Sequence, residues 1–454
     1  MGFASVDPTT GQVFKNYELM PADEVAANVA QCQTAFLKWR DLGFADRASC
    51  LHRAAALLRQ GAAEHAAIMA REMGKPMREG RAEVEKCALG CEHYAEHAAR
   101  MLQPEPAATA ASRSYVTFEP LGVLLAVMPW NFPFWQIFRF GAPALMAGNA
   151  ILLKHAPNVP GCAFAIEQLF REAGAPEGLV RSLLVDTDTA GELIGHPVVQ
   201  GVTLTGSPAA GRAVARQAGQ ALKKCVLELG GSDPYILLDD ADVDDAVGKC
   251  IASRLLNGGQ SCIAAKRFIV PKALRGRFEE RCIAGMAAKK MGNPLDGSTD
   301  IGPLARLDLR DNLHRQVRLS IAAGARCLLG GKIPNGPGAF YPPTVLTDVA
   351  RGMPAYGEEL FGPVAAILPV ADEEEAIETA NDTAYGLGAA IFSSNPERAE
   401  KLAARLRCGS CFVNDFVRSD PALPFGGIKQ SGFGRELGTY GIKEFVNVKS
   451  VWVK

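Results

Sequence analysis

Two short segments of the chain carry residue types that could perform covalent catalysis. Cys262 ends the run Asn257-Gly258-Gly259-Gln260-Ser261-Cys262, and Glu228 lies within Leu227-Glu228-Leu229-Gly230-Gly231. Glycines let the backbone come close to a bound reactant, and a carboxyl group between leucines is poorly hydrated, which raises its pKa toward that of a usable base. The two residues are distant in the sequence, so only folding can bring them together. A thiolate nucleophile with a general base predicts chemistry through a covalent thioester.

An alternation of strands and helices supplies the elements that would position these groups. Residues 22–102 predict helices, among them 45–59 and 78–100, and residues 114–120 predict a strand or hairpin arm. The expected strands that follow are 122–128, 150–154, 179–185 and 198–205, with helices over 134–146, 162–173 and 208–221. After a break near Gly230-Gly231, the expected strands are 235–238, 267–270, 341–347 and 364–370, with helices over 243–256, 274–291 and 373–381. This order favours βαβ units and mostly parallel sheets, and the chain length favours two or three domains.

The segment Val202-Thr203-Leu204-Thr205-Gly206-Ser207-Pro208 predicts a strand that runs into a helix. Gly206 permits the turn, Ser207 suits the N-cap, and Pro208 suits the first helical position. The amides at such a helix start form an anion site suited to a pyrophosphate, although a simple helix cap explains the pattern equally well. Lys154 ends a predicted strand, where it either donates to a ribose or phosphate or remains a solvated charge.

Composition limits the class of protein. The formal charge of −1 gives no reason to expect nucleic acid or an anionic membrane as a partner. The longest apolar run, residues 121–130, is about half of what a membrane span needs, and the first residues lack the pattern of a secretion signal. The twelve cysteines have no metal-type spacing, so we expect no metal site and a reducing compartment, the cytoplasm by default.

Three further motifs complete an ordered set of five. Trp130-Asn131-Phe132-Pro133 precedes the glutamate and cysteine segments, and Glu358-Glu359-Leu360-Phe361-Gly362-Pro363 and Pro424-Phe425-Gly426-Gly427 follow them. In order and spacing this set resembles the aldehyde dehydrogenase superfamily along essentially the whole chain. Residues 154–158 and 223–234 look most like the bacterial succinate-semialdehyde dehydrogenases of the Sad type.

The resemblance implies a role for each catalytic candidate. Cys262 attacks an aldehyde carbonyl, the side-chain amide of Asn131 and the backbone N–H of Cys262 hold the oxyanion, and Glu228 activates the water that releases the acid. Taken singly, each residue also has a plain structural explanation: Cys262 as a small buried residue, Glu228 as an ion-pair partner and Asn131 as a turn-former.

The resemblance also implies a site for NAD or NADP. The residues that match the family's cofactor contacts are Trp130 and Asn131 beside the nicotinamide half, Lys154, His155, Ala156 and Pro157 around the adenosine ribose, Gly206 and Ser207 at the pyrophosphate, Leu229 at the nicotinamide, and Glu359 and Phe361 at the nicotinamide ribose. Many relatives that prefer NAD carry a glutamate where Pro157 stands, and its carboxylate repels a 2′-phosphate. Pro157 cannot do so and His155 could tolerate a phosphate, so the sequence leaves both cofactors open.

Arg139 is the candidate for substrate recognition. It is flanked by Phe138 and Phe140, where a guanidinium is costly without an anionic partner. That partner is either a distant Asp or Glu or a substrate carboxylate. The resemblance matches Arg139 to the arginine that grips the distal carboxylate of succinate semialdehyde, with Ser419 as a second contact and Phe425 in an apolar mouth. Leu256 replaces a second arginine found in some relatives, and Ala264 replaces a redox-switch cysteine.

The resemblance implies an α/β fold in three parts: a Rossmann-type parallel-sheet cofactor domain (1–230), an α/β catalytic domain (231–430) and a C-terminal segment (431–454). A small β arm pairs residues 107–120 with a strand near 445–453 and joins subunits into a homodimer or a dimer of dimers. The expected activity is NAD(P)-dependent oxidation of an aldehyde, above all succinate semialdehyde, to the acid. The alternatives are a broader aliphatic, aromatic or glutarate-semialdehyde specificity, acyl transfer to coenzyme A, and a non-catalytic binding protein on the same fold.

Overall fold

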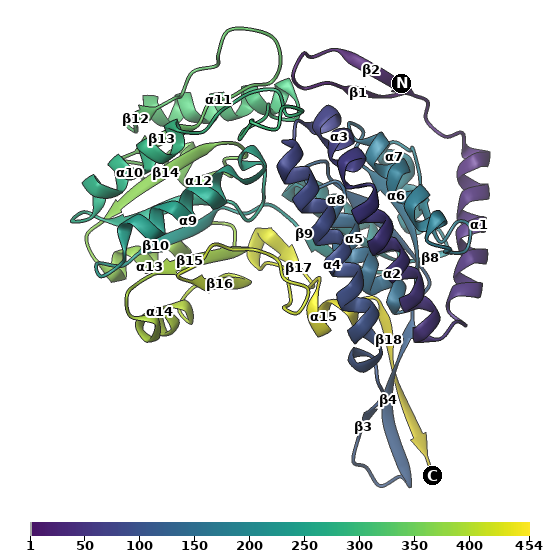
Figure 1. Cartoon of the computed structure of the whole chain (residues 1–454). Helices are drawn as coiled ribbons and strands as arrows, with labels where there is room; N and C mark the ends of the chain where they lie inside the picture. Colours follow the sequence, from purple (N-terminus) through teal and green to yellow (C-terminus); the bar gives the residue numbers. More distant parts are fainter. Residues whose placement is uncertain (1) are drawn as a thin grey trace.

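The computed structural model describes residues 2–454, which form two α/β lobes side by side with an arm projecting below them (Figure 1). The N-terminal lobe is built on a six-stranded sheet in the order β17-β9-β8-β5-β6-β7. Its strands are β5 (Val123–Met128), β6 (Ala150–His155), β7 (Val180–Ser182), β8 (Val199–Thr205), β9 (Lys224–Glu228) and β17 (Gly432–Phe433). All neighbours pair in parallel except β17, which is antiparallel to β9.

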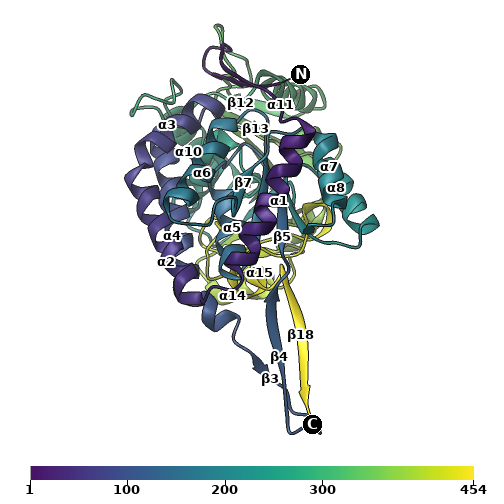
Figure 2. The same cartoon turned by 90° about the vertical axis from the view of Figure 1, so that its right-hand side faces the viewer.

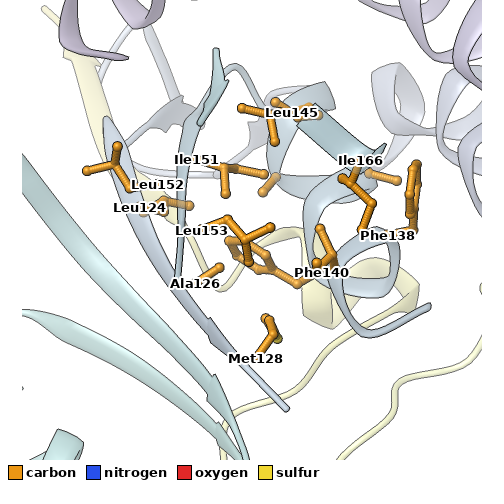
Figure 3. Close-up of a cluster of buried hydrophobic side chains, with 14 of the residues drawn as sticks. Leu124, Ala126, Met128, Phe138, Phe140, Leu145, Ile151, Leu152, Leu153 and Ile166 are labelled. Carbon is orange, nitrogen blue, oxygen red and sulfur yellow. The ribbon is translucent and has the colours of Figure 1, made fainter. Parts of the chain in front are cut away.

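Eight helices of the N-terminal part of the chain pack around this sheet. They are α1 (Ala22–Trp39), α2 (Phe44–Gln60), α3 (Ala62–Met73), α4 (Met77–Met101), α5 (Trp135–Met146), α6 (Pro160–Glu172), α7 (Thr187–Gly195) and α8 (Pro208–Gln220). Strand β5 and the first four residues of β6 are continuous hydrophobic runs, as expected for parallel strands that helices cover on both faces. In Figure 3, side chains such as Leu124 and Leu153 from these strands lie among Phe140 of α5 and Ile166 of α6.

The second lobe is built on a seven-stranded sheet in the order β12-β13-β14-β11-β10-β15-β16. Its strands are β10 (Asp233–Leu237), β11 (Ala265–Pro271), β12 (Arg326–Leu329), β13 (Thr344–Thr347), β14 (Val364–Val370), β15 (Gly388–Phe392) and β16 (Ser410–Val413). Its helices are α9 (Val243–Leu255), η1 (Leu256–Gly259), α10 (Arg275–Ala287), α11 (Leu307–Ala322), α12 (Pro354–Gly357), α13 (Glu373–Asn381) and α14 (Pro396–Ala403). Only β12 pairs antiparallel here.

The chain crosses from one sheet to the other directly after the catalytic candidate Glu228. Strand β9 ends at Glu228, and β10, in the second sheet, begins at Asp233. The short 3-10 helix η2 (Lys429–Ser431) then leads back to β17 in the first sheet, and α15 (Gly438–Ile442) follows. The crossing brings the ends of β9 and β17 to the junction of the lobes.

The arm is a three-stranded antiparallel sheet made from two distant parts of the chain. It consists of β3 (Glu105–Pro106), β4 (Arg113–Pro120) and the C-terminal strand β18 (Val446–Val453), and it projects from the lobes in both views (Figures 1 and 2). Strands β4 and β18 pair along their whole length, from Pro120 opposite Val446 to Arg113 opposite Val453. Of the predicted pairing of residues 107–120 with the C-terminal strand, the part over residues 113–120 is thus confirmed.

Sequence patterns missed or misplaced several elements. The strand expected over 341–347 starts only at Thr344, because Pro342 and Pro343 precede it and proline cannot donate to a ladder. The helix expected to reach Met291 ends at Ala287. The N-terminal hairpin of β1 (Phe3–Val6) and β2 (Val13–Tyr17) was not anticipated either. Among residues 2–454, no helix combines the length and hydrophobicity that crossing a membrane requires.

Candidate active site

Cys262 lines a cavity of about 170 Å³ at the junction of the lobes. The cavity wall is contributed by α4, by α5 with the loop before it, by the cysteine loop 256–263, and by the segment 416–425. The first two belong to the N-terminal lobe, whereas the cysteine loop connects η1 to β11 in the second lobe. The cavity therefore depends on the packing of the lobes against each other.

Unusual backbone conformations and one buried lysine fix the cysteine loop. Gly259 has a φ of 76°, and a Cβ at this position would overlap the carbonyl oxygen of Gly362. Only glycine fits there. Beyond it, the buried Lys266 ammonium donates to the backbone oxygens of Ser261, at 2.9 Å, and Cys262, at 2.7 Å. These contacts fix the backbone of the loop that carries the Cys262 thiol.

Burial of Cys262 favours the protonated form of its thiol. Burial raises its pKa to about 12, and the cations of Arg139 and Lys266 oppose that shift. A thiol is a poor nucleophile compared with a thiolate. Reaction therefore requires a base to take the proton as the substrate arrives.

Asn131 lies in the loop between β5 and α5, and a buried ion pair positions that loop. Lys75 pairs with Glu83, and its ammonium donates to the backbone oxygen of Asn131 at 2.9 Å. The Glu83 carboxylate accepts from the backbone N–H groups of Phe134 and Trp135, both at 2.9 Å. Glu83 thus satisfies amides at the start of α5, where a negative charge is favourable.

Asn131 also connects directly to the cysteine loop. Its side-chain nitrogen donates to the backbone oxygen of Gln260 at 3.0 Å, and Asn257 donates to the Asn131 backbone oxygen at 2.7 Å. The Asn131 amide thus contacts the loop that carries the thiol at Gln260, two positions before Cys262. An amide donor at this position is suited to an oxyanion that forms on a carbon bound to sulfur.

Glu228 is buried at the end of β9, and among residues 2–454 neither of its carboxyl oxygens has a hydrogen-bond partner. Burial raises its pKa well above 4.5; Arg139 opposes the shift and Glu436 adds to it. Gly426 leaves room for this carboxyl group, since a Cβ there would lie 2.5 Å from Glu228 Oε1. An unpaired buried carboxyl group is costly, and such groups cluster at functional sites.

Arg139 is fully buried and forms an ion pair with Glu436, the first of the two alternatives that its local sequence left open. It also donates to Thr205 Oγ1 at 3.2 Å, and its guanidinium lies 4.4 Å from the ring centre of Phe425. Arg139, Ser419 and Phe425 nevertheless all line the cavity that contains Cys262. The predicted grip of Arg139 on a substrate carboxylate stays a prediction.

Four functional side chains escaped the sequence analysis. Lys75 and Glu83 form the ion pair beneath Asn131, Glu436 pairs with Arg139, and Lys86 lines the cavity beside Ser419. Three of them lie in or next to α4, where charged residues alternate with alanines as on any exposed helix. No local signal distinguishes them, because their partners are distant in the sequence.

The predicted cofactor residues near the nicotinamide lie together at the lobe junction. The rings of Trp130 and Phe361 meet edge to face at 5.8 Å. The Glu359 carboxylate accepts from the backbone N–H of Gly231 at 3.0 Å and lies 3.6 Å from Lys266. A partly accessible carboxylate held in this way fits the hydroxyl groups of a ribose.

At the other end of the predicted cofactor site, α8 starts directly after β8. Ser207 caps the helix by accepting from the backbone N–H of Ala210 at 3.3 Å, with Pro208 in the first turn. The start of the helix is accessible at the carboxyl end of a parallel strand, so its amides fit a pyrophosphate. Gly211 lets the helix pack closely on Leu229, since a Cβ there would lie 2.6 Å from Leu229 Cδ1.

The end of β6 supports the predicted cofactor site less clearly. Lys154 is partly buried, and burial lowers its pKa while Asp186 opposes that shift. The His155 ring is buried, bonds to the backbone oxygen of Pro133 at 2.9 Å, and has a pKa lowered by burial to about 4. This neutral imidazole holds the loop after β5, so its ring offers no positive charge to a 2′-phosphate. The predicted ribose contacts of residues 154–157 stay predictions.

Comparison with known proteins identifies the family. The model of the aldehyde dehydrogenase family matches residues 1–451. The probable succinate-semialdehyde dehydrogenase (NADP(+)) of Synechocystis sp. is 50% identical over 453 residues and covers 100% of both chains. Succinate semialdehyde dehydrogenase (NAD(P)+) Sad of Escherichia coli is 47% identical over 448 residues, covering 99% of this chain and 97% of the other. The crystal structure of succinic semialdehyde dehydrogenase from Streptococcus pyogenes with NADP+ matches with a TM-score of 0.97 at 39% identity, over 99% of both chains. The chain therefore belongs to the aldehyde dehydrogenase family.

The ion pair beneath Asn131 gives a stability prediction. We expect Lys75→Met to lower the free energy of unfolding by about 3–5 kcal/mol, because it leaves the Glu83 charge buried without its cation. Urea unfolding followed by tryptophan fluorescence measures this. The control is Arg59→Met, which removes an exposed partner of Glu85 and Glu92 and is expected to cost less than about 1 kcal/mol. Equal losses for the two variants would contradict the role of the buried pair.

The raised pKa of Glu228 gives a prediction for pH. Between the ordinary pKa of 4.5 and the raised folded value, the unfolded chain has released this proton while the folded chain keeps it. Stability therefore falls as pH rises through that window, by up to about 1.4 kcal/mol per pH unit. Glu228→Gln lacks this loss, so its stability relative to the wild type should increase with pH in thermal melts across the window. The exposed Glu24→Gln serves as control, and parallel curves for all three proteins would refute the assignment.

Proposed function

We propose that this protein oxidises an aldehyde to a carboxylic acid with NAD or NADP, and that succinate semialdehyde is its substrate. The observation that carries the proposal is the placement of Cys262 and Arg139 in the wall of one cavity, with Asn131 bonded to the loop that carries Cys262. Arg139 lies close enough to interact electrostatically with both the Cys262 thiol and the buried Glu228 carboxyl group, and Asn131 contacts the loop of Cys262. These are the nucleophile, the base and the oxyanion donor of an acyl-forming reaction.

The chain's own residues account for both halves of the reaction. The Cys262 thiol releases its proton to water and Sγ attacks the aldehyde carbon, and the Asn131 amide with the Cys262 backbone N–H stabilises the oxygen that becomes negative, roughly 3 kcal/mol for each donor. A bound nicotinamide supplies the acceptor for the hydride that leaves this carbon. Glu228 then takes a proton from water, the water oxygen attacks the thioester carbon, and the C–S bond breaks to release the acid. Cys262 suits both steps because a thiolate is also a good leaving group.

The lining of the cavity supports a short substrate with a negative charge. Its wall includes the cationic side chains of Lys86, Arg139 and Arg418, the carboxyl groups of Glu79 and Glu83, and the aromatic rings of Trp135 and Phe425. Aromatic walls enclose a short alkyl chain, and the cations favour a carboxylate at its far end. The two curated relatives reported above carry succinate-semialdehyde dehydrogenase in their names, which agrees with this chemistry.

We propose that the protein can use either NAD or NADP. Pro157 has no carboxylate to repel a 2′-phosphate, and the relatives' names and title include NADP+ and NAD(P)+. We also propose a reducing compartment such as the cytoplasm. The twelve cysteines all lie within the described residues and are free thiols, which supports a reducing compartment.

We further propose that the arm joins two copies of this chain. Strand β18 is an edge strand whose far side has no partner in the described chain, and its side chains Val448 and Trp452 are 59% and 61% exposed. An unpaired edge with exposed apolar side chains is suited to strand addition or sheet packing by a second copy. The proposal covers a homodimer or a dimer of dimers.

Two variants test the covalent mechanism. Cys262→Ala should abolish oxidation. Glu228→Gln should still give one equivalent of reduced cofactor and then turn over roughly 100-fold to 10,000-fold more slowly, because deacylation lacks its base. Stopped-flow absorbance of the reduced cofactor and mass spectrometry of the Cys262 peptide measure the burst and the acyl group. Equal steady-state rates for Glu228→Gln and the wild type would remove Glu228 from its role, and acyl-coenzyme A among the products would favour the transferase alternative.

The arm proposal has its own test. We expect the double variant Val448→Lys and Trp452→Glu to have a lower molar mass than the wild type in light scattering, because charges on an edge strand oppose pairing. Leu222→Glu changes a residue that is 95% exposed outside the arm and should leave the mass unchanged. A monomeric wild-type protein would refute the proposal outright.

A further inference from the structure

The loop that carries Cys262 contains three consecutive residues in the left-handed backbone region, and one of them is not a glycine. Asn257, Gly258 and Gly259 have φ values of 56°, 60° and 76°. Glycine adopts this region without strain, whereas a residue with a side chain stays there only when its surroundings hold it. The contacts of Asn257 therefore determine whether the loop keeps its conformation.

One of these contacts comes from α4. The Glu79 carboxyl group accepts from the backbone N–H of Asn257, with 2.8 Å between Oε2 and the nitrogen. Among residues 2–454 this is the one hydrogen bond between α4 and the loop 256–263. Glu79 is partly buried and lines the cavity that contains Cys262, yet no step of the proposed reaction uses it.

The side chain of Asn257 is fixed separately from its backbone N–H. Its nitrogen donates to the backbone oxygens of Asn131, at 2.7 Å, and Gln260, at 3.1 Å. Because φ is the rotation about the bond between the backbone nitrogen and Cα, Glu79 holds one side of this rotation and the side-chain contacts hold the other. Without Glu79 the N–H side is free to turn. Asn131, the oxyanion donor, and the Cys262 loop would then lose their fixed relative position.

We propose that Glu79 is a positioning residue whose charged carboxylate holds Asn257, and with it the Cys262 loop, in the conformation that reacts with the aldehyde. This inference rests on the proposed function. A carboxylate binds an N–H group more strongly than a neutral carboxyl group does. The loop is therefore held firmly only while Glu79 is ionised.

The charge of Glu79 changes near neutral pH. Burial raises its pKa to about 7; Lys75, the Asn257 N–H and Arg78 oppose that shift, and Glu83 adds to it. The other titratable or charged side chains in the cavity wall are those of Lys86, Arg139, Cys262 and Arg418. Glu79 is charged above its pKa and neutral below it. The attack of Cys262 should therefore lose the contribution of Glu79 as pH falls through about 7.

The experiment measures the rate constant for the burst of reduced cofactor at saturating aldehyde in the intact enzyme. The decisive quantity is the wild-type rate constant divided by that of Glu79→Gln, in which the pH dependence of other groups cancels. Glutamine is a neutral acceptor, so this ratio should be about 1 below pH 6 and about fivefold to twentyfold above pH 8. Glu79→Ala has no acceptor and should be slower than both at every pH.

Two comparisons distinguish positioning from other effects of the substitution. The matched control, Glu96→Gln, removes an exposed carboxyl group from the same helix and should give a ratio of about 1 throughout. Succinate semialdehyde and butanal should give the same ratio for Glu79→Gln, because the effect lies in the loop. A ratio that does not change with pH, or an effect limited to the charged aldehyde, would overturn the inference.

Hydrogen exchange tests the same contact without turnover. At pH 8 the peptide that contains Asn257 should exchange its amide hydrogens faster in Glu79→Gln than in the wild type and in Glu96→Gln. Equal exchange in all three proteins would overturn the inference even if the enzyme is active. If the wild type oxidises neither aldehyde, the proposed function is wrong, and the exchange rates still show whether Glu79 holds the loop.

Discussion

The active site depends on one buried ion pair, between Lys75 and Glu83. Two charges away from water are costly unless further hydrogen bonds complete them. Here the ammonium also binds the backbone oxygen of Asn131, and the carboxylate binds two amides at the start of α5. Asn257 of the second lobe donates to the same Asn131 oxygen. One carbonyl group is thus fixed by both lobes, so the oxyanion donor and the cysteine loop keep a single relative position.

A second buried pair sets the electrostatics of the reacting groups. Arg139 favours the charged forms of both Cys262 and Glu228, whereas burial favours the neutral forms and prevails at both residues. Glu436 neutralises much of the arginine charge and so prevents it from stabilising a permanent thiolate. The result is a site in which neither group is fully ionised at rest. That arrangement suits a reaction in two steps, because the thiolate is needed before the carboxylate and the two negative charges would repel each other.

The sequence revealed those parts of the molecule that local signals encode. The apolar runs of β5 and β6, the cap at Ser207 and the motif residues Cys262 and Glu228 could all be recognised without a structure. What it could not reveal were pairs joined only by folding: Arg139 and Glu436 are 297 positions apart, and Lys86 and Ser419 are 333 apart. The short, small-residue strands β15 and β16 escaped for a related reason, since only their neighbours in the sheet make them strands.

The catalytic loops and the far wall of the cavity are built from different parts of the chain. Cys262 and Asn131 lie on loops, and Gly259 and the buried side chains of Lys75 and Lys266 fix the backbone of these loops. The far wall of the cavity comes from α4 and residues 416–425, and α4 also carries Glu83, which holds the start of α5. Leu256, at the place where some relatives carry an arginine, lines the same cavity as Lys86.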